Sequence, residues 1–450
     1  MFSALHYVCT RLLKFCPTDF LEYFFCPRTA LRLYEVIKIS SYGLFGTLFL
    51  FPALHYVCTG LLKFRPTDFL VFIDFLLFLE NNQKNGEMHL NRLSIVNYKN
   101  ILQAELDFSP HINCFIGNNG VGKTNVLDAV YYLSFCKSHS NSIDSQNINH
   151  SQDFFMLDGF YIRDGKEEYI YCGLKRKQKK IFKRNKKEYE RLSDHIGLLP
   201  LVLISPNDGV LIGEGSEERR KFINGVISQY DNMYLNNLMR YNKTLMQRNS
   251  LLKNKFVDND LIEVLNDTLV ETGQFIHEKR TAFIQEFLPI FQQFYNFISM
   301  DKETVDLKYS SHLQKGDFEE LLKKSLERDK IIGFTTKGIH KDDLEMTLGS
   351  YAIKRVGSQG QNKTYLIALK LAQFDFLKRM SGMNPILLLD DIFDKLDAER
   401  VHQIIKLVSE NGFGQIFITD TNRQHLDEII KTVNSNYRLF AVENGEVINN

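Results

Sequence analysis

The chain contains the segment Gly117-Asn118-Asn119-Gly120-Val121-Gly122-Lys123-Thr124, which matches the phosphate-binding pattern G-x-x-x-x-G-K-[ST] at every fixed position. An apolar run over 112–116 precedes the segment and predicts a strand, and apolar residues at helical spacing follow it. Glycines permit the tight turn that directs successive N–H groups into one concavity, and the start of a helix favours anions there. The segment therefore predicts a loop that holds a polyphosphate.

The chemistry of this pattern assigns roles to its last two residues. We expect Lys123 to reach the β and γ phosphates and to assist catalysis, and the Thr124 hydroxyl to bind Mg²⁺. The expected contacts of the bound ATP are the whole loop and the residue after it: Gly117, Asn118, Asn119, Gly120, Val121, Gly122, Lys123, Thr124 and Asn125.

The second informative segment is acidic and lies far downstream, where residues 385–391 read Pro-Ile-Leu-Leu-Leu-Asp-Asp. Four consecutive aliphatic residues predict a strand buried on both faces, and open α/β sheets bind ligands at the carboxyl ends of such strands. We expect Asp390 to hold the metal opposite Thr124, and Asp391 to orient or deprotonate the attacking water. Without the phosphate loop, a buried strand ending in a solvated acidic turn would be the simpler interpretation.

A third element lies between these two. Residues 355–361 read Arg-Val-Gly-Ser-Gln-Gly-Gln and open a helical pattern that runs to about Met380. Ser358 is a favoured N-cap residue, and an exposed helix N-terminus can bind an anion. The segment resembles the signature loop of ABC-type ATPases, which contacts the γ-phosphate held by a second subunit. The resemblance assigns that contact to Ser358, Gly360 and Gln361, whereas a capped surface helix is the alternative.

One further segment resembles ABC-type ATPases, and another differs from them. Asp394-Lys395-Leu396-Asp397 resembles their D-loop. The predicted strand over 415–419 ends in Thr419-Asp420-Thr421, where most members carry a histidine. His425 follows in a predicted helix, and we interpret it as a surface residue.

From Met88 onward the chain resembles the RecF family of bacterial DNA repair and recombination ATPases. Lys341 and Lys99 stand where arginine is expected, and lysine keeps the charge but loses the planar donor fork. The motifs that carry the resemblance follow one another in order: 88–100, Asn118, Asn119 and Asn125, 205–208, 215–222, 338–343, Asp390-Asp391 and 419–421.

The resemblance and the element pattern predict an α/β fold. We expect an ABC-type ATPase head, a phosphate-loop mixed sheet with flanking helices, with an inserted α-helical lobe. A helical pattern runs from 216 to about 255 and a second from about 261 to 298, with a possible bend near Pro289. The expected division is 1–87 as an extension, 88–210 and 331–450 as the two halves of the ATPase lobe, and 211–330 as the helical lobe.

Residues 1–87 lie outside the family's length. The run 4–10 recurs at 53–59 and the run 17–21 at 66–70, and the span 39–62 lacks charged residues. That span is long enough for a membrane helix, although it contains glycines, a proline and a histidine. A membrane anchor, an extra module and translated upstream DNA with the true start at Met88 are the three explanations. The duplication favours the last, and we expect this segment to be disordered or poorly packed.

The overall composition of the chain says little about its binding partners. There are 55 lysines and arginines against 54 acidic residues, so any DNA site must be a local patch. The densest basic run covers 175–187 and predicts a hairpin that turns near Asn185. A solvated face and a contact to the DNA backbone explain it equally well. Arg219, Arg220 and Lys221 either face DNA or couple the lobes. The seven cysteines form no C-x-x-C pair, which suits a reducing cytoplasm and no zinc site.

The resemblance implies an ATP-dependent DNA-binding protein of replication, recombinational repair and the SOS response. An ATP- and Mg²⁺-dependent homodimer would close on DNA gaps or junctions without sequence specificity, with RecR and RecO as partners in the cytoplasm and no membrane. Asp391 is one methylene shorter than the glutamate common in ABC ATPases, so we expect a weak, DNA-stimulated ATPase. The alternatives are the ATPase subunit of a membrane transporter, which the helical insertion and the missing histidine disfavour, and a nucleotide-regulated scaffold without meaningful hydrolysis.

Overall fold

The computed structural model describes residues 86–254, 258–393, 396, 398–410, 412–421 and 437–449, which belong to one compact unit, 85–450. The predictions for residues 1–85, for most of the D-loop-like segment and for His425 lie outside the described residues. Across the described ranges, no helix is both long and apolar enough to cross a membrane.

The sheet that carries the phosphate loop has six strands in the order β15-β14-β3-β13-β12-β8. All neighbours run parallel except the β14–β15 pair. Every residue of β12 and β13 is buried, as expected for central strands covered on both faces. The strands are β3 (Ile112–Ile116), β8 (Leu201–Ile204), β12 (Ile386–Asp390), β13 (Ile416–Asp420), β14 (Tyr437–Glu443) and β15 (Glu446–Asn449).

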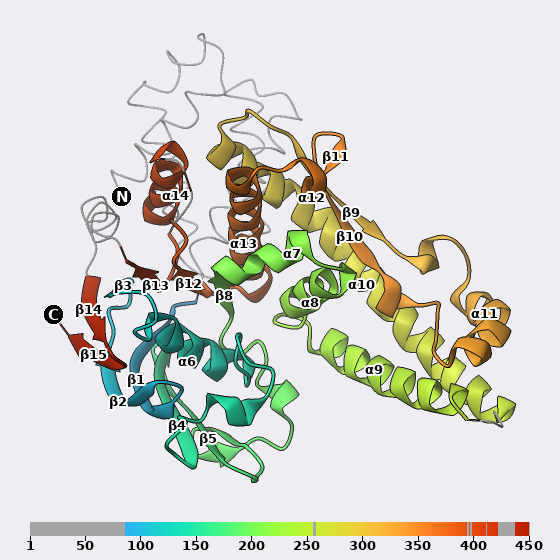
Figure 1. Ribbon diagram of the computed structural model, residues 1–450, viewed down its shortest axis with the longest axis horizontal. Helices are drawn as coiled ribbons and strands as arrows, with labels where there is room; N and C mark the ends of the chain where they lie inside the picture. Colours follow the sequence, from blue (N-terminus) through green and yellow to red (C-terminus); the bar gives the residue numbers. More distant parts are fainter. Residues whose placement is uncertain are drawn as a thin grey trace, which may run out of the picture. The chain divides into compact units, whose positions relative to one another are not determined.

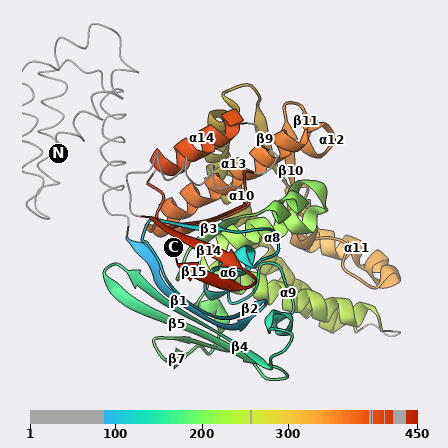
Figure 2. The same ribbon diagram turned by 60° about the vertical axis from the view of Figure 1, so that its left-hand side comes forward.

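A second, antiparallel sheet has the order β2-β1-β4-β5-β6-β7. Helix α6 (Lys123–Phe135) packs between the two sheets and contacts strands of both (Figure 2). One face of the antiparallel sheet therefore joins the core, and the other faces outward. Its strands are β1 (Met88–Tyr98), β2 (Ile101–Asp107), β4 (Phe154–Arg163), β5 (Lys166–Lys175), β6 (Ile181–Arg184) and β7 (Lys187–Glu188).

The helical part contains the expected pair of long helices, α9 (Asn232–Leu252) and α10 (Asn259–Ser299), which pack against each other (Figure 1). The prediction of a helix over about 261–298 is confirmed, and Pro289 lies inside α10. The single pattern expected from 216 to about 255 is divided, because α8 (Ser216–Ile227) ends before Asp231. The Asp231 side chain caps a new helix by accepting a hydrogen bond from the Tyr234 N–H.

A three-stranded sheet in the order β11-β10-β9 and several short helices join the helical part to the ATPase halves. Helix α13 (Gln359–Ser381) packs on α10 and leads into β12 through the connection 382–385. The remaining elements are α7 (Val210–Gly213), β9 (Val305–Ser310), α11 (Phe318–Ile332), β10 (Asp343–Leu348), β11 (Tyr351–Ala352), α12 (Ile353–Val356) and α14 (Ala398–Glu410), with short 3₁₀ turns at Asp144–Asn147, Leu192–Asp194, Pro206–Gly209, His312–Gln314 and Ile339–Lys341.

Candidate nucleotide-binding site

The predicted phosphate loop lies between β3, which ends at Ile116, and α6, which begins at Lys123. Gly120 and Gly122 have φ angles of 80° and 119°, a region that favours glycine. A Cβ at position 122 would also lie 2.8 Å from the side-chain amide of Asn100. The backbone conformation therefore favours glycine at 122, and a Cβ there would displace the Asn100 amide.

Asn100, in the turn between β1 and β2, holds the loop from outside. Its Nδ2 donates to the Val121 carbonyl at 3.0 Å, and its Oδ1 accepts from Asn125 Nδ2 at 2.7 Å. The Gly445 N–H donates to the same Val121 carbonyl at 2.9 Å. Asn100 lies in a family-like segment of the sequence, but no local pattern predicts a role for it. No spacing pattern connects it to a loop twenty residues later.

Lys123 lies at the junction of the phosphate loop and α6, near several carboxylates. Its Nζ donates to the carbonyls of Gly117 and Asn118 at 2.6 and 2.9 Å. Burial lowers the pKa of Lys123, although Asp391, Asp390 and Asp420 oppose this shift. The ammonium is thus held by backbone oxygens beside the acids at the carboxyl ends of β12 and β13.

Thr124 and Asp390 meet across 266 residues of sequence. The Thr124 hydroxyl lies 2.9 and 3.0 Å from the two carboxylate oxygens of Asp390. Thr419, at the end of the intervening strand β13, donates to Asp390 Oδ1 at 2.7 Å. A hydroxyl and a carboxylate that converge in this way are the hard oxygen ligands that Mg²⁺ prefers. The residues present therefore fit a magnesium ion.

Asp391 follows β12 in a left-handed conformation with φ 48°, which is uncommon outside glycine. Its N–H lies 3.1 Å from the Thr419 hydroxyl and 3.2 Å from the Thr419 carbonyl, so the end of β13 sustains this conformation. The turn places Asp391 beside the phosphate loop, where its charge acts on Lys123. Thr419 thus positions both acids, a role that the sequence pattern did not single out.

The signature-like segment forms the start of α13. The Ser358 N–H donates to Gln361 Oε1 at 2.8 Å, and the Gln361 N–H donates to Ser358 Oγ at 3.2 Å, which is a capping box. Gln361 Nε2 also donates to Glu303 at 2.6 Å. Ser358 is exposed. In the part of the chain that the structure describes, no hydrogen bond joins residues 358–361 to the loop 117–124.

The length of α13 explains this separation. Twenty-three helical residues span about 34 Å, whereas the five residues of β12 span about 17 Å. The helix returns beside the sheet, so its N-terminus extends well past the carboxyl edge where Lys123 and Asp390 lie. One chain therefore does not bring its two expected nucleotide contacts together.

Two of the three basic residues after Ser216 act inside the chain. Arg219 pairs with Asp343 through two hydrogen bonds of 2.7 and 3.0 Å, and Arg220 donates to the Asp342 carbonyl at 2.7 Å. Of the two alternatives for these arginines, the structure shows coupling between α8 and β10. Among the described residues, the ion pairs of Lys221 are with Glu217 and Glu218 on its own helix.

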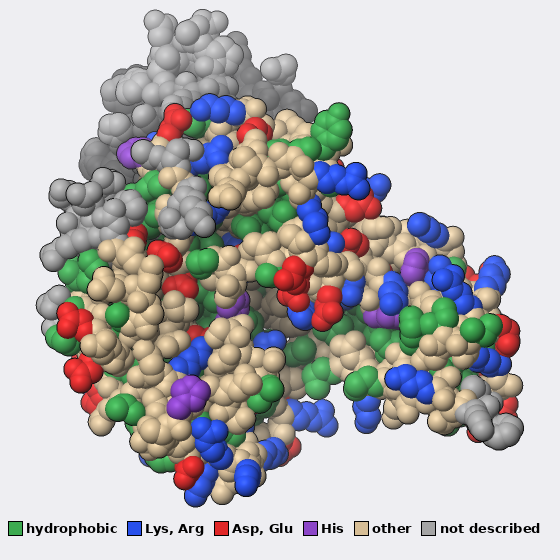
Figure 3. All heavy atoms as spheres, viewed as in Figure 1, with side chains coloured by type: hydrophobic (Ala, Val, Ile, Leu, Met, Phe, Trp, Pro, Cys, Tyr) green, Lys and Arg blue, Asp and Glu red, His purple; other side chains and the backbone are tan. Residues whose placement is uncertain are grey.

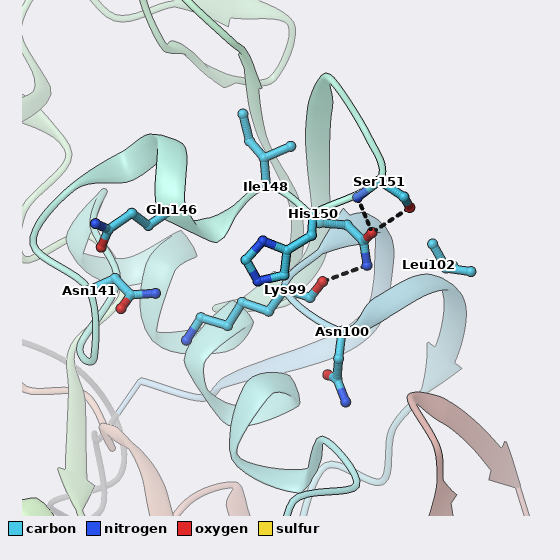
Figure 4. A pocket seen from close by; sticks show the side chains of 9 residues that line it. Lys99, Asn100, Leu102, Asn141, Gln146, Ile148, His150 and Ser151 are labelled. Atoms are coloured by element: carbon cyan, nitrogen blue, oxygen red, sulfur yellow. Dashed lines mark hydrogen bonds between the residues drawn. The ribbon is translucent and has the colours of Figure 1, made fainter.

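A pocket of about 570 Å³ lies next to the loop, on the other side of Asn100 (Figure 4). Asn149 shapes its wall, because its Nδ2 donates to the Lys99 carbonyl at 2.7 Å and its Oδ1 accepts from Ser151. The Lys99 ammonium is paired with Asp128 of α6 at 2.6 Å. Amides, a histidine and two aliphatic side chains line the pocket: Lys99, Asn100, Leu102, Asn141, Gln146, Ile148, Asn149, His150 and Ser151. No pattern in the sequence predicts this pocket.

Comparison with known proteins gives a consistent picture. Residues 89–447 match the family described as the RecF/RecN/SMC N terminal domain. The DNA replication and repair protein RecF of Bacteroides thetaiotaomicron is 62% identical over 362 residues, covering 80% of this chain and 98% of the relative. The protein of that name from Flavobacterium johnsoniae is 50% identical over 357 residues, covering 78% of this chain and 99% of the relative.

Solved structures agree. The recombination mediator protein RecF with ATP, from the RecFOR pathway, matches with a TM-score of 0.73 and 28% identity, covering 81% of this chain and 98% of that one. An Smc head domain from Pyrococcus furiosus matches with a TM-score of 0.50 and 16% identity, covering 81% of this chain and 96% of that one, and supports the fold alone.

Proposed function

The chain belongs to the RecF family, and from this premise we propose that it is an ATP-dependent DNA-binding protein of replication and recombinational repair. Its relatives are named for DNA replication and repair, and a structural neighbour is a complex with ATP. These matches favour DNA repair over the membrane-transporter alternative. The single observation that carries the proposal is the contact between Thr124 and Asp390. It brings the phosphate loop together with the acidic end of β12, where the metal would be held.

The loop supports the binding of ATP through its own groups. The glycine turn and the start of α6 present N–H donors to the phosphates, and Lys123 supplies a positive charge. Thr124 and Asp390 would hold Mg²⁺, which neutralises phosphate charge when bound. The pocket beside Asn100 offers amide groups and a paired lysine next to the loop, and we propose that it receives the base and ribose.

We propose that a second copy completes the site. The exposed Ser358 end of α13 lies away from the loop of its own chain, and helix N-termini favour anions. Ser358, Gly360 and Gln361 of the partner would then close over the γ-phosphate. ATP would drive dimerisation on DNA gaps or junctions in the cytoplasm, and RecR and RecO are the partners that the family suggests.

Asp391 is the candidate base, and its short side chain suits slow turnover. Removing a general base costs about 10²- to 10⁴-fold in rate. We expect Asp391→Asn to bind ATP, to release phosphate at least about 100-fold more slowly, and to stay dimeric on DNA. Phosphate release by that variant at the parent rate would show that the base is another residue. Phosphate release by the parent protein, with and without gapped DNA, separates the ATPase from a scaffold that does not hydrolyse ATP.

Retention of DNA tests the proposed function as a whole. Gapped duplex should be retained by the full chain with ATP and released with ADP. Lys123→Ala should lose both ATP binding and ATP-dependent retention, whereas Lys323→Ala, an exposed lysine paired with Glu319 on its own helix, should keep both. Equal retention with ATP and with ADP would contradict the proposal.

A further inference from the structure

Apart from Lys183, which is half-buried beside Tyr171, the cations of the basic run 175–187 divide into two groups in the structure. Lys180 pairs with Asp144 at 2.8 Å, and Arg184 pairs with Glu168, so these two cations stabilise the fold. The other group is exposed and forms no ion pair among the described residues: Lys175, Arg176, Lys177, Lys179, Lys186 and Lys187. Basic side chains gather at the lower end of the lobe that carries β4 and β5 (Figure 3).

These cations border the outward face of the antiparallel sheet. Side chains alternate between the two faces of a strand. On β4 and β5 the inward residues, such as Phe155 and Ile170, are fully buried toward α6. The outward residues beside the basic turns include Phe154, which is 36% exposed, and Ile181 of β6, which is 40% exposed. Phe154 stands opposite Lys175 in the β4–β5 pairing. An exposed aromatic side chain here contributes nothing to the core.

Tyr171 places an aromatic ring on this outward face of the sheet. A Cβ at Gly173 would collide with the Tyr171 hydroxyl, so the tyrosine ring lies over the glycine two residues along β5. Tyr171 as a whole is half-exposed. Lys183, opposite Tyr171 in the β5–β6 pairing, places its ammonium 5.7 Å from the ring centroid. The result is a flat aromatic ring with a cation beside it.

We propose that this surface, the aromatic–basic patch (Phe154, Tyr171, Ile181, Lys175, Lys179 and Lys183), binds single-stranded DNA. The inference rests on the proposed function and adds the part of the DNA that this face contacts. Lysines attract the backbone by displacing counterions. Exposed aromatic rings stack on unpaired bases, whose faces a duplex hides. A duplex or an acidic protein would engage the cations but would leave the rings without a partner.

The same strand supplies a matched control. Phe160 points to the same face of β4 and is 42% exposed, but it packs on Tyr169 at the opposite end of the strand. There the cross-strand neighbour Arg92 is paired with Asp107 at 2.8 Å, and Asp158 accepts a hydrogen bond from Tyr169. Phe160 therefore offers an exposed aromatic ring whose cross-strand cation is already engaged by Asp107.

The test measures binding of a fluorescein-labelled oligothymidylate to the full chain with ATP, by anisotropy at several salt concentrations. Phe154→Ala should weaken binding by about 5- to 150-fold and leave the salt slope unchanged. Phe160→Ala should bind within about twofold of the parent, since this ring packs on Tyr169 outside the patch and its loss removes no stacking on DNA. Binding of ATP by both variants reports that they are folded.

The lysines of the patch are tested separately, through the salt dependence of oligothymidylate binding. Lys175→Ala with Lys179→Ala should reduce the salt slope for the oligothymidylate by about 1.4, or about 0.7 for each backbone contact. The control pair is Lys323→Ala with Lys324→Ala, because these exposed lysines are paired with Glu319 and Glu320 on α11. The control pair should leave the slope unchanged.

Several results would overturn the inference. One is parent-like oligothymidylate binding by Phe154→Ala, even if the lysine pair proves important, because charge alone would then explain binding. Another is an equal loss in Phe160→Ala. A parent protein that retains gapped duplex with ATP but ignores oligothymidylate would remove the inference and leave the proposed function standing. Retention of neither DNA would instead be a failure of the proposed function.

Discussion

At the scale of single residues, the site depends on groups that hold the chemical residues in place. Thr419 donates to Asp390 and meets the N–H of Asp391, so one hydroxyl positions both acids. Asn100 does the same for the phosphate loop through Val121 and Asn125. The residues expected to contact ATP were found from local patterns, whereas these supporting residues depend on contacts between distant segments.

Thr419→Val keeps the shape of the side chain and removes the hydroxyl. A hydrogen bond to a charged group contributes about 1.5–3 kcal/mol, so the variant should need about 10- to 100-fold more Mg²⁺ for half-maximal phosphate release. Thr421→Val, at an exposed position two residues later, is the matched control and should behave like the parent. A Mg²⁺ titration at saturating ATP measures both. An unchanged Mg²⁺ requirement in Thr419→Val would contradict the positioning role.

His195 makes the stability of the ATPase lobe depend on pH. Burial lowers the pKa of His195 to about 4, although the hydrogen bond between its Nε2 and the Leu133 carbonyl opposes this shift. Its Nδ1 lies 3.0 Å from the Tyr189 hydroxyl. The unfolded chain, with a histidine pKa of about 6.5, binds the proton more readily. Stability contributed by the neutral ring is therefore present above about pH 6.5 and is lost as the pH falls toward 4.

The expected loss between pH 7 and pH 5 is about 2 kcal/mol from this residue. His195→Gln retains a donor for the Leu133 carbonyl but does not titrate, so the difference in unfolding free energy between the two pH values should shrink by that amount. Urea unfolding at both pH values measures it. The same difference in the variant and the parent would show that His195 is not the titrating group.

At the scale of elements, the helices and strands that were predicted from the sequence are those marked by a regular local spacing of apolar residues. The strand–loop–helix around 117–124, the strand that ends at Asp390, the helix capped by Ser358 and the long helix α10 are all present. The break before α9 was not predicted, because the apolar spacing continues through it and only the Asp231 cap marks the new start. The order of the strands, with β13 between β3 and β12, is a property of long-range pairing that local patterns do not contain.

Arg280 shows how the helical elements are held together. It is buried on α10 and bonds to Asp342 at 2.7 Å, to the Ile339 carbonyl at 2.9 Å, and to Asn224 and Tyr234 of α8 and α9 at 2.9 and 3.1 Å. Its partner Asp342 directly precedes Asp343, which pairs with Arg219. The segment between α11 and β10 is thereby tied to three helices.

Removing one partner of a buried ion pair costs about 3–5 kcal/mol, whereas a surface pair contributes less than about 1 kcal/mol. Arg280→Ala should therefore lower the free energy of unfolding by about 3–5 kcal/mol. Arg240→Ala on α9, whose partner Glu271 is exposed, should lower it by less than about 1 kcal/mol. Denaturant unfolding of the two variants compares them. Similar losses would mean that the buried network does not hold these helices together.

At the scale of the whole molecule, we propose that one chain carries both halves of a nucleotide contact but keeps them apart. Lys123, Thr124 and Asp390 form one half at the carboxyl edge of the central sheet. The capped start of α13 is the other, and its hydrogen bonds go to itself and to Glu303. Two copies arranged head to head would give two complete sites, with ATP at each contact.

Sedimentation of the full chain on gapped duplex, with a non-hydrolysable ATP analogue or with ADP, tests this claim most directly. The parent should sediment as a dimer with the analogue and as a monomer with ADP. Ser358→Arg should bind the analogue yet remain monomeric, while Ser358→Thr, which keeps the hydroxyl and the cap, should dimerise. A parent protein that remains monomeric on DNA when saturated with the analogue would contradict the account.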